Sequence, residues 1–469
     1  MVRGQCWRGE SEQDWLPAWE CAGTVETDRD QHEPEPEQRL KWAEEQEGPG
    51  GAVAAVVYCR DEADVVAAVR FATGRDLRIA VRCGGHNGGG LGSVDDGLVI
   101  DLSELNAVTV DPVERLAWMQ GGATLNQVVA ATHEHGLTVP VGIIGTTGVG
   151  GLTLGGDVGH LTRAFGLTID TLVAATVVLA DGSIVEADAT REPDLFWALR
   201  GGGGNFGIVT SFSFRCHPPT TVLAGPVLYD LDDAADLLRW YREFLPALPD
   251  ELGGFFAFLS IPPGPPFPEE LHLRKVCGVV WTQAGEEESV SLLEARAFGK
   301  PLLDGIAPLP MPAWNSAFDG VYPAGDQWYW RGEFVQEISD AAVAHHVEHG
   351  RAMPAWKSTM HLYPVDGAAG RVAGDATAWA YRDAVWAQVI GGVDPDPANA
   401  AAIRDWAIGY SDAGKPYTLG TGYVNFQMQE TGDRVRAMYG SNYDRIARVK
   451  AHYDPENVFR VNQNIVPAS

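Results

Sequence analysis

The clearest chemical signal in the chain runs from Ile79 to Gly90 (IAVRCGGHNGGG), where a β-branched strand leads into a glycine-dense loop with His86 in its middle. Glycines tolerate positive φ and close backbone approach, so successive N–H groups of such a loop can surround an anion such as a pyrophosphate. Arg82 adds a fixed cation beside the loop. The competing interpretation is an ordinary glycine-rich turn with a solvent-facing histidine, because one glycine cluster alone is weak evidence.

Two further glycine-rich runs follow within the next hundred or so residues. The second extends from Gly142 to Gly159, and we expect it to be a loop. The third extends from Gly201 to Val209 and reads GGGGNFGIV. Three such runs in one domain fit an extended dinucleotide that is contacted mainly by backbone groups.

These motifs resemble the FAD-linked oxidases of the vanillyl-alcohol oxidase and berberine-bridge-enzyme-like family, which carry a PCMH-type FAD-binding domain. The resemblance covers residues 50–219 and the C-terminal stretch from Asn442 to Pro467. It implies FAD as the cofactor. In the family the histidine of the Arg-x-Gly-Gly-His loop is bonded through its ring to the 8α-methyl carbon of the flavin, and His86 stands at that position.

The resemblance also implies the residues that contact the cofactor. Asn462 and Asn464 are candidates to hydrogen-bond the isoalloxazine edge, because amides both donate and accept. Besides His86, the full predicted set comprises Arg82, Cys83, Gly84, Gly85, Asn87 and Gly88 in the first run, Thr147, Gly148, Gly150, Gly151, Gly155, Gly156 and Gly159 in the second, Asn205, Gly207, Ile208 and Val209 in the third, and Tyr423, Asn425, Asn462 and Asn464 near the C-terminus.

Three positions of the second run bear on the chemistry that the resemblance implies. Many relatives attach the flavin a second time through a cysteine, but Ile144 stands at that position, so we expect attachment through His86 alone. A single attachment favours a modest-sized substrate over a long oligosaccharide. Thr147 stands where the family places a residue near the flavin carbon that meets oxygen, and its small size favours O2 as electron acceptor. Asp157 interrupts the family's Gly-Gly-Gly-x-Gly pattern and is expected either to bear on the cofactor or to face solvent.

An alcohol substrate requires a base, because removal of the hydroxyl proton drives hydride out of the C–H bond. The segment Gly422–Phe426 resembles a family strand that places a tyrosine and an asparagine over the flavin. Tyr423 is therefore the candidate base, with simple packing as the alternative, and its phenol, with a pKa near 10, would need a downward shift. His361 and Tyr363 could line the pocket, but a role in the core is the favoured interpretation.

Histidines at positions 345, 346 and 349 are at helical spacing, which could indicate a metal site. No carboxylate pattern accompanies them, so we expect a solvated helix face and no metal. The six cysteines show no CxxC or zinc spacing and are predicted to be mostly free, buried thiols of a reducing compartment.

The composition of the 469-residue chain limits its partners. A net charge of −29 argues against nucleic acid and anionic membrane surfaces, because no basic stripe is present. The N-terminus lacks an apolar signal core, so we expect a cytoplasmic location. The expected partners are a small-molecule substrate and O2, and the sequence gives no signal for an oligomeric state.

The predicted fold class is α+β, with four segments along the chain. Residues 1–49 are acidic and are predicted to form a poorly ordered tail or a loosely attached helix. Residues 50–219 are predicted to form a two-lobed PCMH-type FAD-binding domain, whose β-α-β-loop-β start suits a flavin domain better than a Rossmann unit. Its first helix is expected to be capped at Asp61 and to end at Gly74, and residues 180–183 are expected to form a hairpin turn. Residues 220–427 are predicted to form a substrate domain with an antiparallel sheet backed by helices. Residues 428–469 are predicted to return to the FAD domain as a berberine-bridge-like segment.

Three functions are compatible with this sequence. The first is an FAD-dependent oxidase that takes hydride from a small or medium-sized alcohol, sugar or amine and passes the electrons to O2. The second keeps the fold but uses another electron acceptor, which makes the protein a dehydrogenase. The third is a non-catalytic flavin-binding protein, which the altered glycine run around Asp157 would mark.

Overall fold

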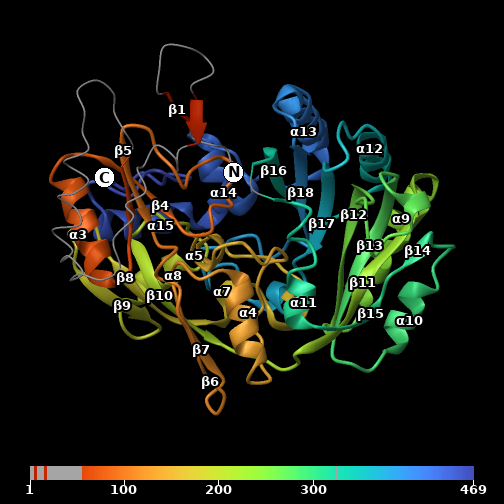
Figure 1. Ribbon diagram of the computed structural model, residues 1–469, viewed down its shortest axis with the longest axis horizontal. Coiled ribbons are helices and arrows are strands. Elements are labelled where there is room, and N and C mark those ends of the chain that lie inside the picture. The colour runs from red at the N-terminus through yellow and green to blue at the C-terminus, as the bar shows by residue number, and fades with distance from the viewer. Residues whose placement is uncertain (1–4, 8–14, 18–54, 324) are drawn as a thin grey trace.

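The computed structural model describes residues 5–7, 15–17, 55–323 and 325–469, and its described part is α+β, as predicted (Figure 1). Strands β1 (Gln5–Trp7) and β2 (Trp15–Pro17) pair with each other antiparallel. The predicted poorly ordered segment 1–49 otherwise lies outside the described residues. Within the described residues, no helix combines the length and the apolar character that a bilayer span requires.

A small parallel sheet opens the main body of the protein. Its strands are β3 (Ala55–Tyr58), β4 (Arg78–Arg82) and β5 (Gly97–Asp101), in the order β3-β5-β4. Helix α3 (Glu62–Thr73) connects β3 to β4, and the Asp61 side chain accepts a 2.9 Å hydrogen bond from the Asp64 N–H at its start. The predicted strand–helix–strand order and the predicted helix end at Gly74 are confirmed.

A five-stranded antiparallel sheet lies next to it in the order β6-β7-β10-β8-β9. The predicted hairpin turn at residues 180–183 joins β8 to β9. One prediction is wrong here, because the second glycine run is not a loop throughout but contains helix α5. The elements are β6 (Val108–Asp111), β7 (Leu116–Gln120), α4 (Leu125–His133), α5 (Val149–Leu154), α6 (Thr162–Phe165), α7 (Thr168–Thr171), β8 (Leu172–Val178), β9 (Ile184–Asp188), α8 (Pro193–Leu199) and β10 (Ile208–Arg215).

The predicted antiparallel sheet backed by helices follows, with eight strands. Seven run in the order β14-β11-β13-β12-β17-β18-β16, and β15 also pairs with β11. The strands are β11 (Thr221–Asp230), β12 (Leu252–Ser260), β13 (Lys275–Ala284), β14 (Leu303–Asp304), β15 (Ala307–Pro310), β16 (Gln327–Val335), β17 (Thr359–Pro364) and β18 (Trp386–Asp394). The helices of this region are α9 (Ala234–Phe244), α10 (Val290–Arg296), α11 (Met311–Asn315), α12 (Asp340–Arg351) and α13 (Ala400–Gly414).

The two faces of this large sheet have different neighbours. Helices α9, α12 and α13 cover one face (Figure 1), where Met360 and Leu362 of β17 are buried in the core beneath them. Successive side chains of a strand point to opposite faces. The alternate residues His361 and Tyr363 therefore point away from these helices, toward the half of the protein that holds the glycine runs.

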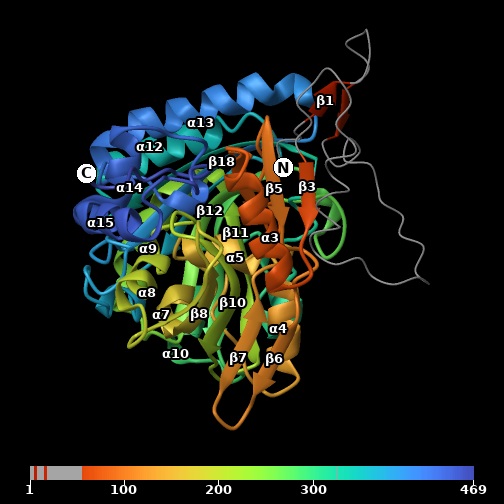
Figure 2. The ribbon, with the colours of Figure 1, turned by 90° about the vertical axis from the view of Figure 1, so that its left-hand side faces the viewer.

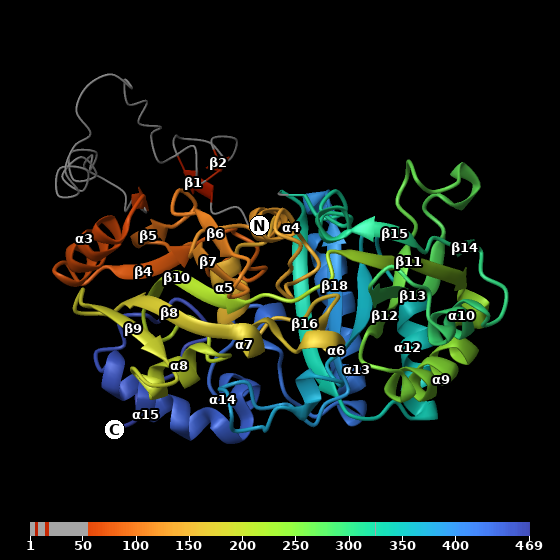
Figure 3. The same ribbon diagram turned by 90° about the horizontal axis from the view of Figure 1, so that it is seen from below.

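The chain ends in helices α14 (Asp433–Tyr439) and α15 (Tyr443–Tyr453), and α15 packs against α8 (Figures 2 and 3). Lys450 of α15 is fully buried and forms an ion pair of 2.6 Å with Asp454, which is also fully buried. Its ammonium also donates hydrogen bonds of 2.7 Å to the Asn205 carbonyl and 2.9 Å to the Phe459 carbonyl. This buried cation therefore joins the C-terminal segment to the third glycine run.

Replacing Lys450 with methionine should lower the free energy of unfolding by about 3–5 kcal/mol, because the Asp454 carboxylate would stay buried without its partner. Urea unfolding measures this loss. The matched control is Lys415→Met, which removes the exposed 2.7 Å pair with Asp412 and should cost less than about 1 kcal/mol. Equal effects of the two substitutions would contradict the structural role of the buried pair.

Candidate functional site

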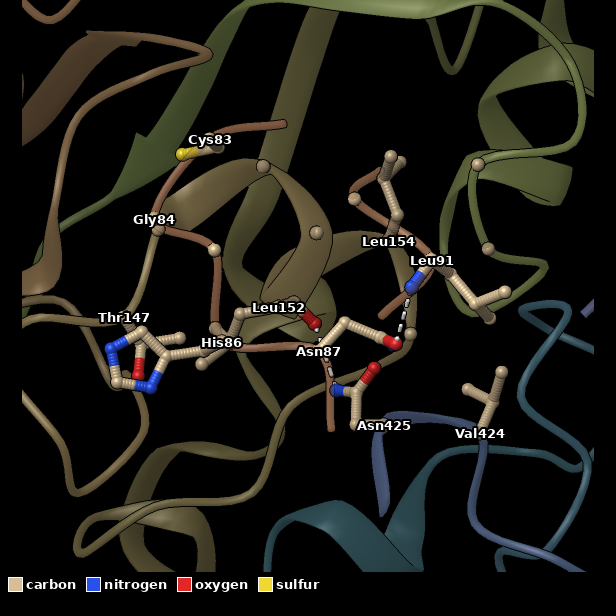
Figure 4. A pocket seen from close by; sticks show the side chains of 18 of the residues that line it. Cys83, Gly84, His86, Asn87, Leu91, Thr147, Leu152, Leu154, Val424 and Asn425 are labelled. Carbon is tan, nitrogen blue, oxygen red and sulfur yellow. Dashed lines mark hydrogen bonds between the residues drawn. The ribbon is translucent and has the colours of Figure 1, made fainter. Parts of the chain in front are cut away.

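A cavity of about 560 Å³ lies between the glycine runs and the face of the eight-stranded sheet opposite to α9, α12 and α13. All three glycine runs line it, together with strands β16 and β17, the short 3-10 helix Val424–Phe426 and residues 459–463 of the C-terminal segment. Figure 4 shows part of its wall, where the His86 loop approaches the segment that carries Asn425. The volume is within the range of small-molecule and cofactor sites.

The first two glycine runs touch each other through glycines. A Cβ atom on Gly84 would come within 2.3 Å of the Gly148 nitrogen, and a Cβ on Gly148 would come within 2.1 Å of the Cys83 sulfur. By contrast, Gly151 and Gly204 line the cavity and have no atoms within 4 Å of a Cβ position. The cavity therefore has walls of bare backbone that a dinucleotide could approach closely, so the residues present fit the predicted cofactor.

His86 projects from the first run, and its side chain is exposed to the cavity. Its Nε2 atom lies 2.9 Å from the Thr146 hydroxyl. Desolvation by the surrounding protein lowers the pKa of the imidazole below 6.5, and the nearby Asp319 carboxylate opposes this shift. The ring is therefore mostly neutral at neutral pH, and one of its nitrogens keeps a lone pair.

Arg82 and Cys83, which precede the glycines of this loop, each have a defined charge state. Arg82 forms an ion pair with the buried carboxylate of Asp101, so its charge is balanced within the protein. Burial raises the pKa of the Cys83 thiol to about 11, although N–H groups of Gly150 and Gly84 lower it in part. Cys83 is therefore a neutral thiol at neutral pH and a poor nucleophile.

Asparagines connect the cavity wall to its supports. The Asn87 side chain accepts a 3.1 Å hydrogen bond from the Leu91 N–H, and the Asn425 amide donates a 3.0 Å bond to the Leu152 carbonyl (Figure 4). Asn205 accepts a 3.0 Å bond from the Ile465 N–H, and Asn462 donates a 2.9 Å bond to the Gly204 carbonyl. The bonds of Asn205 and Asn462 hold the C-terminal segment against the third glycine run.

The cavity includes most of the residues that the sequence predicted as cofactor contacts. Three glycines that it leaves out are packed against other groups: Gly88 against Trp330, Gly156 against Trp379, and Gly159 against the Val141 carbonyl. Tyr423 and Asn464 also do not line it. The predicted residues that do are Arg82, Cys83, Gly84, Gly85, His86, Asn87, Thr147, Gly148, Gly150, Gly151, Gly155, Asn205, Gly207, Ile208, Val209, Asn425 and Asn462.

The geometry does not support Tyr423 as a base. Its side chain is 1% exposed, and it packs in the core against Phe334 and Phe426. Burial raises the pKa of its phenol well above 10, and the nearby Asp157 adds to this shift. The expectation required a lowered pKa and access to the substrate, and the structure provides neither, so packing is the better interpretation.

His361 and Tyr363, for which a core role was favoured, both line the cavity. With them the structure brings Tyr322, Trp328 and Trp330, which the sequence analysis did not single out. Strict alternation could have identified the residues that lie in strands. Thr359, His361 and Tyr363 occupy every second position of β17, and Trp328 and Trp330 do so in β16.

Asp319 also lines the cavity, and no sequence pattern marks it. One of its carboxylate oxygens accepts a 2.6 Å bond from the Gly145 N–H, and the other accepts a 2.8 Å bond from the Asn126 amide. It therefore anchors the second glycine run. Asp157, for which a solvent-facing position was one alternative, is instead 3% exposed and lines the cavity.

The predicted solvated histidine face is wrong. His345 and His346 are buried on α12, and the Nδ1 atom of His346 lies 2.9 Å from the Tyr410 hydroxyl of α13. Within the described part of the chain, no group of three or more histidine, cysteine or acidic side chains could hold a metal ion. The sequence could not reveal this burial, because it comes from the packing of α13 on α12.

Comparisons with known proteins agree on one class. A family model described as "FAD binding domain" matches residues 53–188, and one described as "Berberine and berberine like" matches residues 422–466. YgaK, an uncharacterized FAD-linked oxidoreductase of Bacillus subtilis, is 33% identical over 426 residues, which cover 88% of this chain and 91% of that protein.

Two further similarities concern oxidases. The (R)-6-hydroxynicotine oxidase of Paenarthrobacter nicotinovorans is 29% identical over 434 residues, covering 88% of this chain and 91% of that protein. The crystal structure of 6-hydroxy-D-nicotine oxidase from Arthrobacter nicotinovorans superposes with a TM-score of 0.77 at 25% identity, covering 88% of this chain and 92% of that one.

The buried histidines predict acid lability. Burial lowers the pKa of His346 to about 3, and repulsion from His345 and His349 adds to this. An unfolded histidine titrates near 6.5, so below that pH the unfolded chain binds a proton that the folded protein does not. This titration leaves the free energy of unfolding unchanged above about pH 6.5 and should lower it by about 1.4 kcal/mol per pH unit as the pH drops below that value.

Urea unfolding from pH 7.5 to 4.5 tests this expectation. His346→Gln keeps an acceptor for Tyr410 and should lose less stability on acidification than the unsubstituted protein. His452→Gln, at an exposed position of α15, is the matched control and should follow the unsubstituted protein. The assignment fails if the two variants show the same pH dependence.

Proposed function

We propose that this chain, which belongs to the FAD-linked oxidoreductases of the vanillyl-alcohol oxidase and berberine-bridge-like family and binds FAD, is an oxidase with its flavin covalently attached to His86. Its substrate is a small or medium-sized alcohol, sugar or amine, from which hydride passes to the flavin. The electrons then pass to O2. The relative that is named an oxidase of 6-hydroxynicotine supports this class of reaction.

The observation that carries the proposal is the state of His86. Its ring is exposed to a glycine-walled cavity, its pKa is lowered by desolvation, and its Nε2 atom is engaged by Thr146. A neutral imidazole keeps a lone pair on one of its ring nitrogens. Attachment to a carbon of the flavin requires such a lone pair, so the neutral ring of His86 is suited to this role.

Bound FAD supplies the two-electron acceptor, and the protein supplies position and surroundings. The backbone of the three glycine runs holds the dinucleotide, while Asn425 and Asn462 support the cavity wall through their bonds to Leu152 and Gly204. Ile144 lines the cavity where many relatives carry a second anchoring cysteine, and Cys83 is a protonated thiol. A single attachment through His86 follows.

The alternatives differ in what happens to the electrons. A dehydrogenase would bind and reduce its flavin in the same way but reoxidise slowly in air. A non-catalytic flavin-binding protein would show no flavin reduction with any alcohol, sugar or amine. Photoreduction without oxygen, followed by admission of air, separates the first of these from an oxidase, and a substrate panel separates the second.

The variant His86→Ala should release its FAD on acid precipitation, because the covalent bond is lost, whereas the unsubstituted protein should stay yellow. Peptide mass mapping of the unsubstituted protein should place the flavin mass on the peptide that contains His86 and on no cysteine. His135→Ala, at an exposed histidine after α4, is the matched control and should keep its flavin. Retention of flavin by denatured His86→Ala would overturn the assignment.

The variant Thr147→Leu should slow reoxidation of the reduced flavin by air at least tenfold, because a larger side chain would block oxygen at this position of the cavity wall. Thr147→Val is nearly isosteric and should reoxidise at the original rate. Stopped-flow absorbance of the flavin after mixing with air-saturated buffer measures both rates. Unchanged reoxidation in Thr147→Leu would show that oxygen does not pass this residue.

A further inference from the structure

Strand β17 presents three polar side chains in a row toward the cavity half of the protein. Thr359, His361 and Tyr363 alternate with Met360 and Leu362, which are buried beneath the helices on the other face. All three polar residues are at least 94% buried, and His361 and Tyr363 line the cavity. Buried polar groups are costly unless they are hydrogen-bonded, so their bonds define their arrangement.

The bonds fix the direction of every proton in this row. The Thr359 hydroxyl lies 2.8 Å from the Phe258 carbonyl, which can only accept, so Thr359 donates its single proton there. The Nε2 atom of His361 lies 2.7 Å from the Thr359 oxygen and must therefore be the donor. In a neutral imidazole the other nitrogen then accepts, so Nδ1 accepts the proton of the Tyr363 hydroxyl, 2.5 Å away.

The consequence concerns the Tyr363 oxygen. Its own proton is committed to His361, so what remains on this oxygen is a lone pair that can accept a hydrogen bond. Burial lowers the pKa of His361 to about 3 and raises that of Tyr363 well above 10. Both groups are therefore neutral at neutral pH, and the arrangement is insensitive to pH around that value.

The rest of this part of the cavity is largely aromatic. The rings of Trp328 and Trp330 are stacked with centroids 5.3 Å apart, and Phe426 lies 5.5 Å from Trp330. Both carboxylate oxygens of Asp319 accept bonds from within the protein. The indole N–H of Trp328 is buried and has no partner among the described residues, so it remains available as a donor.

The geometry points to Tyr363 as the residue that positions the substrate, by accepting a hydrogen bond from its hydroxyl or neutral amine group, and to a substrate whose body is an apolar ring that packs on the tryptophan wall. This inference rests on the proposed function. A sugar would bring many donors and acceptors to a surface that is largely aromatic, and their desolvation would be unfavourable. The substrate class is therefore a compact aryl or cyclic alcohol or amine.

Binding of four simple probes to the flavin-loaded protein tests the inference, with flavin absorbance changes and calorimetry as readouts. Benzyl alcohol and benzylamine carry the donor, toluene lacks it, and cellobiose represents a sugar. Benzyl alcohol should bind about tenfold more tightly than toluene, the advantage expected of one hydrogen bond. In Tyr363→Phe this advantage should fall to less than twofold, while toluene binding stays unchanged.

Two more variants keep the test specific. Thr359→Val removes the acceptor that fixes the His361 tautomer, and it should reduce the preference for benzyl alcohol without removing the Tyr363 hydroxyl. Tyr229→Phe removes a buried hydroxyl that donates to the Phe298 carbonyl at 3.0 Å, away from the cavity, and should leave the preference intact. A Tyr363→Phe variant that retains the tenfold preference overturns the inference, and so does tighter binding of cellobiose than of benzyl alcohol.

The inference and the proposed function fail separately. Loss of flavin from the unsubstituted protein on acid precipitation, or slow reoxidation in air, refutes the proposed function without touching the probe preferences. Conversely, a covalent flavin that reoxidises rapidly beside a probe preference that is insensitive to Tyr363→Phe leaves the oxidase in place and refutes the role of Tyr363.

Discussion

The close approach of Gly84 and Gly148 is the constraint on which the site depends. Neither residue can carry a side chain without meeting the other's backbone or the Cys83 sulfur. The contact joins the loop after β4 to the start of α5, two segments that are far apart in the chain. His86 follows two residues later and is thereby carried to the cavity, where Thr146 of the second run meets its ring. Backbone contact thus positions the one side chain that the proposed chemistry needs.

The opposite wall depends on the alternation of the large sheet. One face is occupied by α9, α12 and α13, and on the other face Trp328 and Trp330 of β16 and His361 and Tyr363 of β17 line the cavity. A sheet buried on both faces usually reads as a continuous apolar run. In β17 the apolar run is interrupted by Thr359, His361 and Tyr363. Their side chains are hydrogen-bonded to one another, and the Thr359 hydroxyl also bonds to the Phe258 carbonyl. Polar residues inside a sheet core are here a property of the site and not a packing fault.

Sequence patterns predicted the parts whose causes are local. The Asp61 cap and the end at Gly74 are set by neighbouring residues, and both were predicted correctly. The burial of His346 was not predicted, and packing was only the alternative interpretation for Tyr423, because both are buried by helices and loops that are distant in sequence. Histidines at helical spacing on α12 were expected to be solvated, but α13 covers them. Tyr423 was the candidate base because it lies in a segment that resembles a family strand, but its side chain lies in the core. Helix α5 was not predicted, because glycine has a low helix propensity. The stability of this helix comes from its tertiary packing, which the sequence pattern does not show.

Asp157 shows how the cavity avoids charge in a protein whose net charge is −29. The Thr168 hydroxyl lies 2.6 Å from the Pro140 carbonyl, an obligate acceptor, so Thr168 donates there. The Thr168 hydroxyl also contacts the Asp157 carboxyl group, and burial raises the pKa of Asp157 to about 8 although the bond with Thr168 lowers it in part. Asp157 is therefore mostly protonated at neutral pH, Arg82 is neutralised by Asp101, and Asp319 is engaged by two N–H donors. Recognition inside the cavity is therefore left to backbone, aromatic rings and single hydrogen bonds.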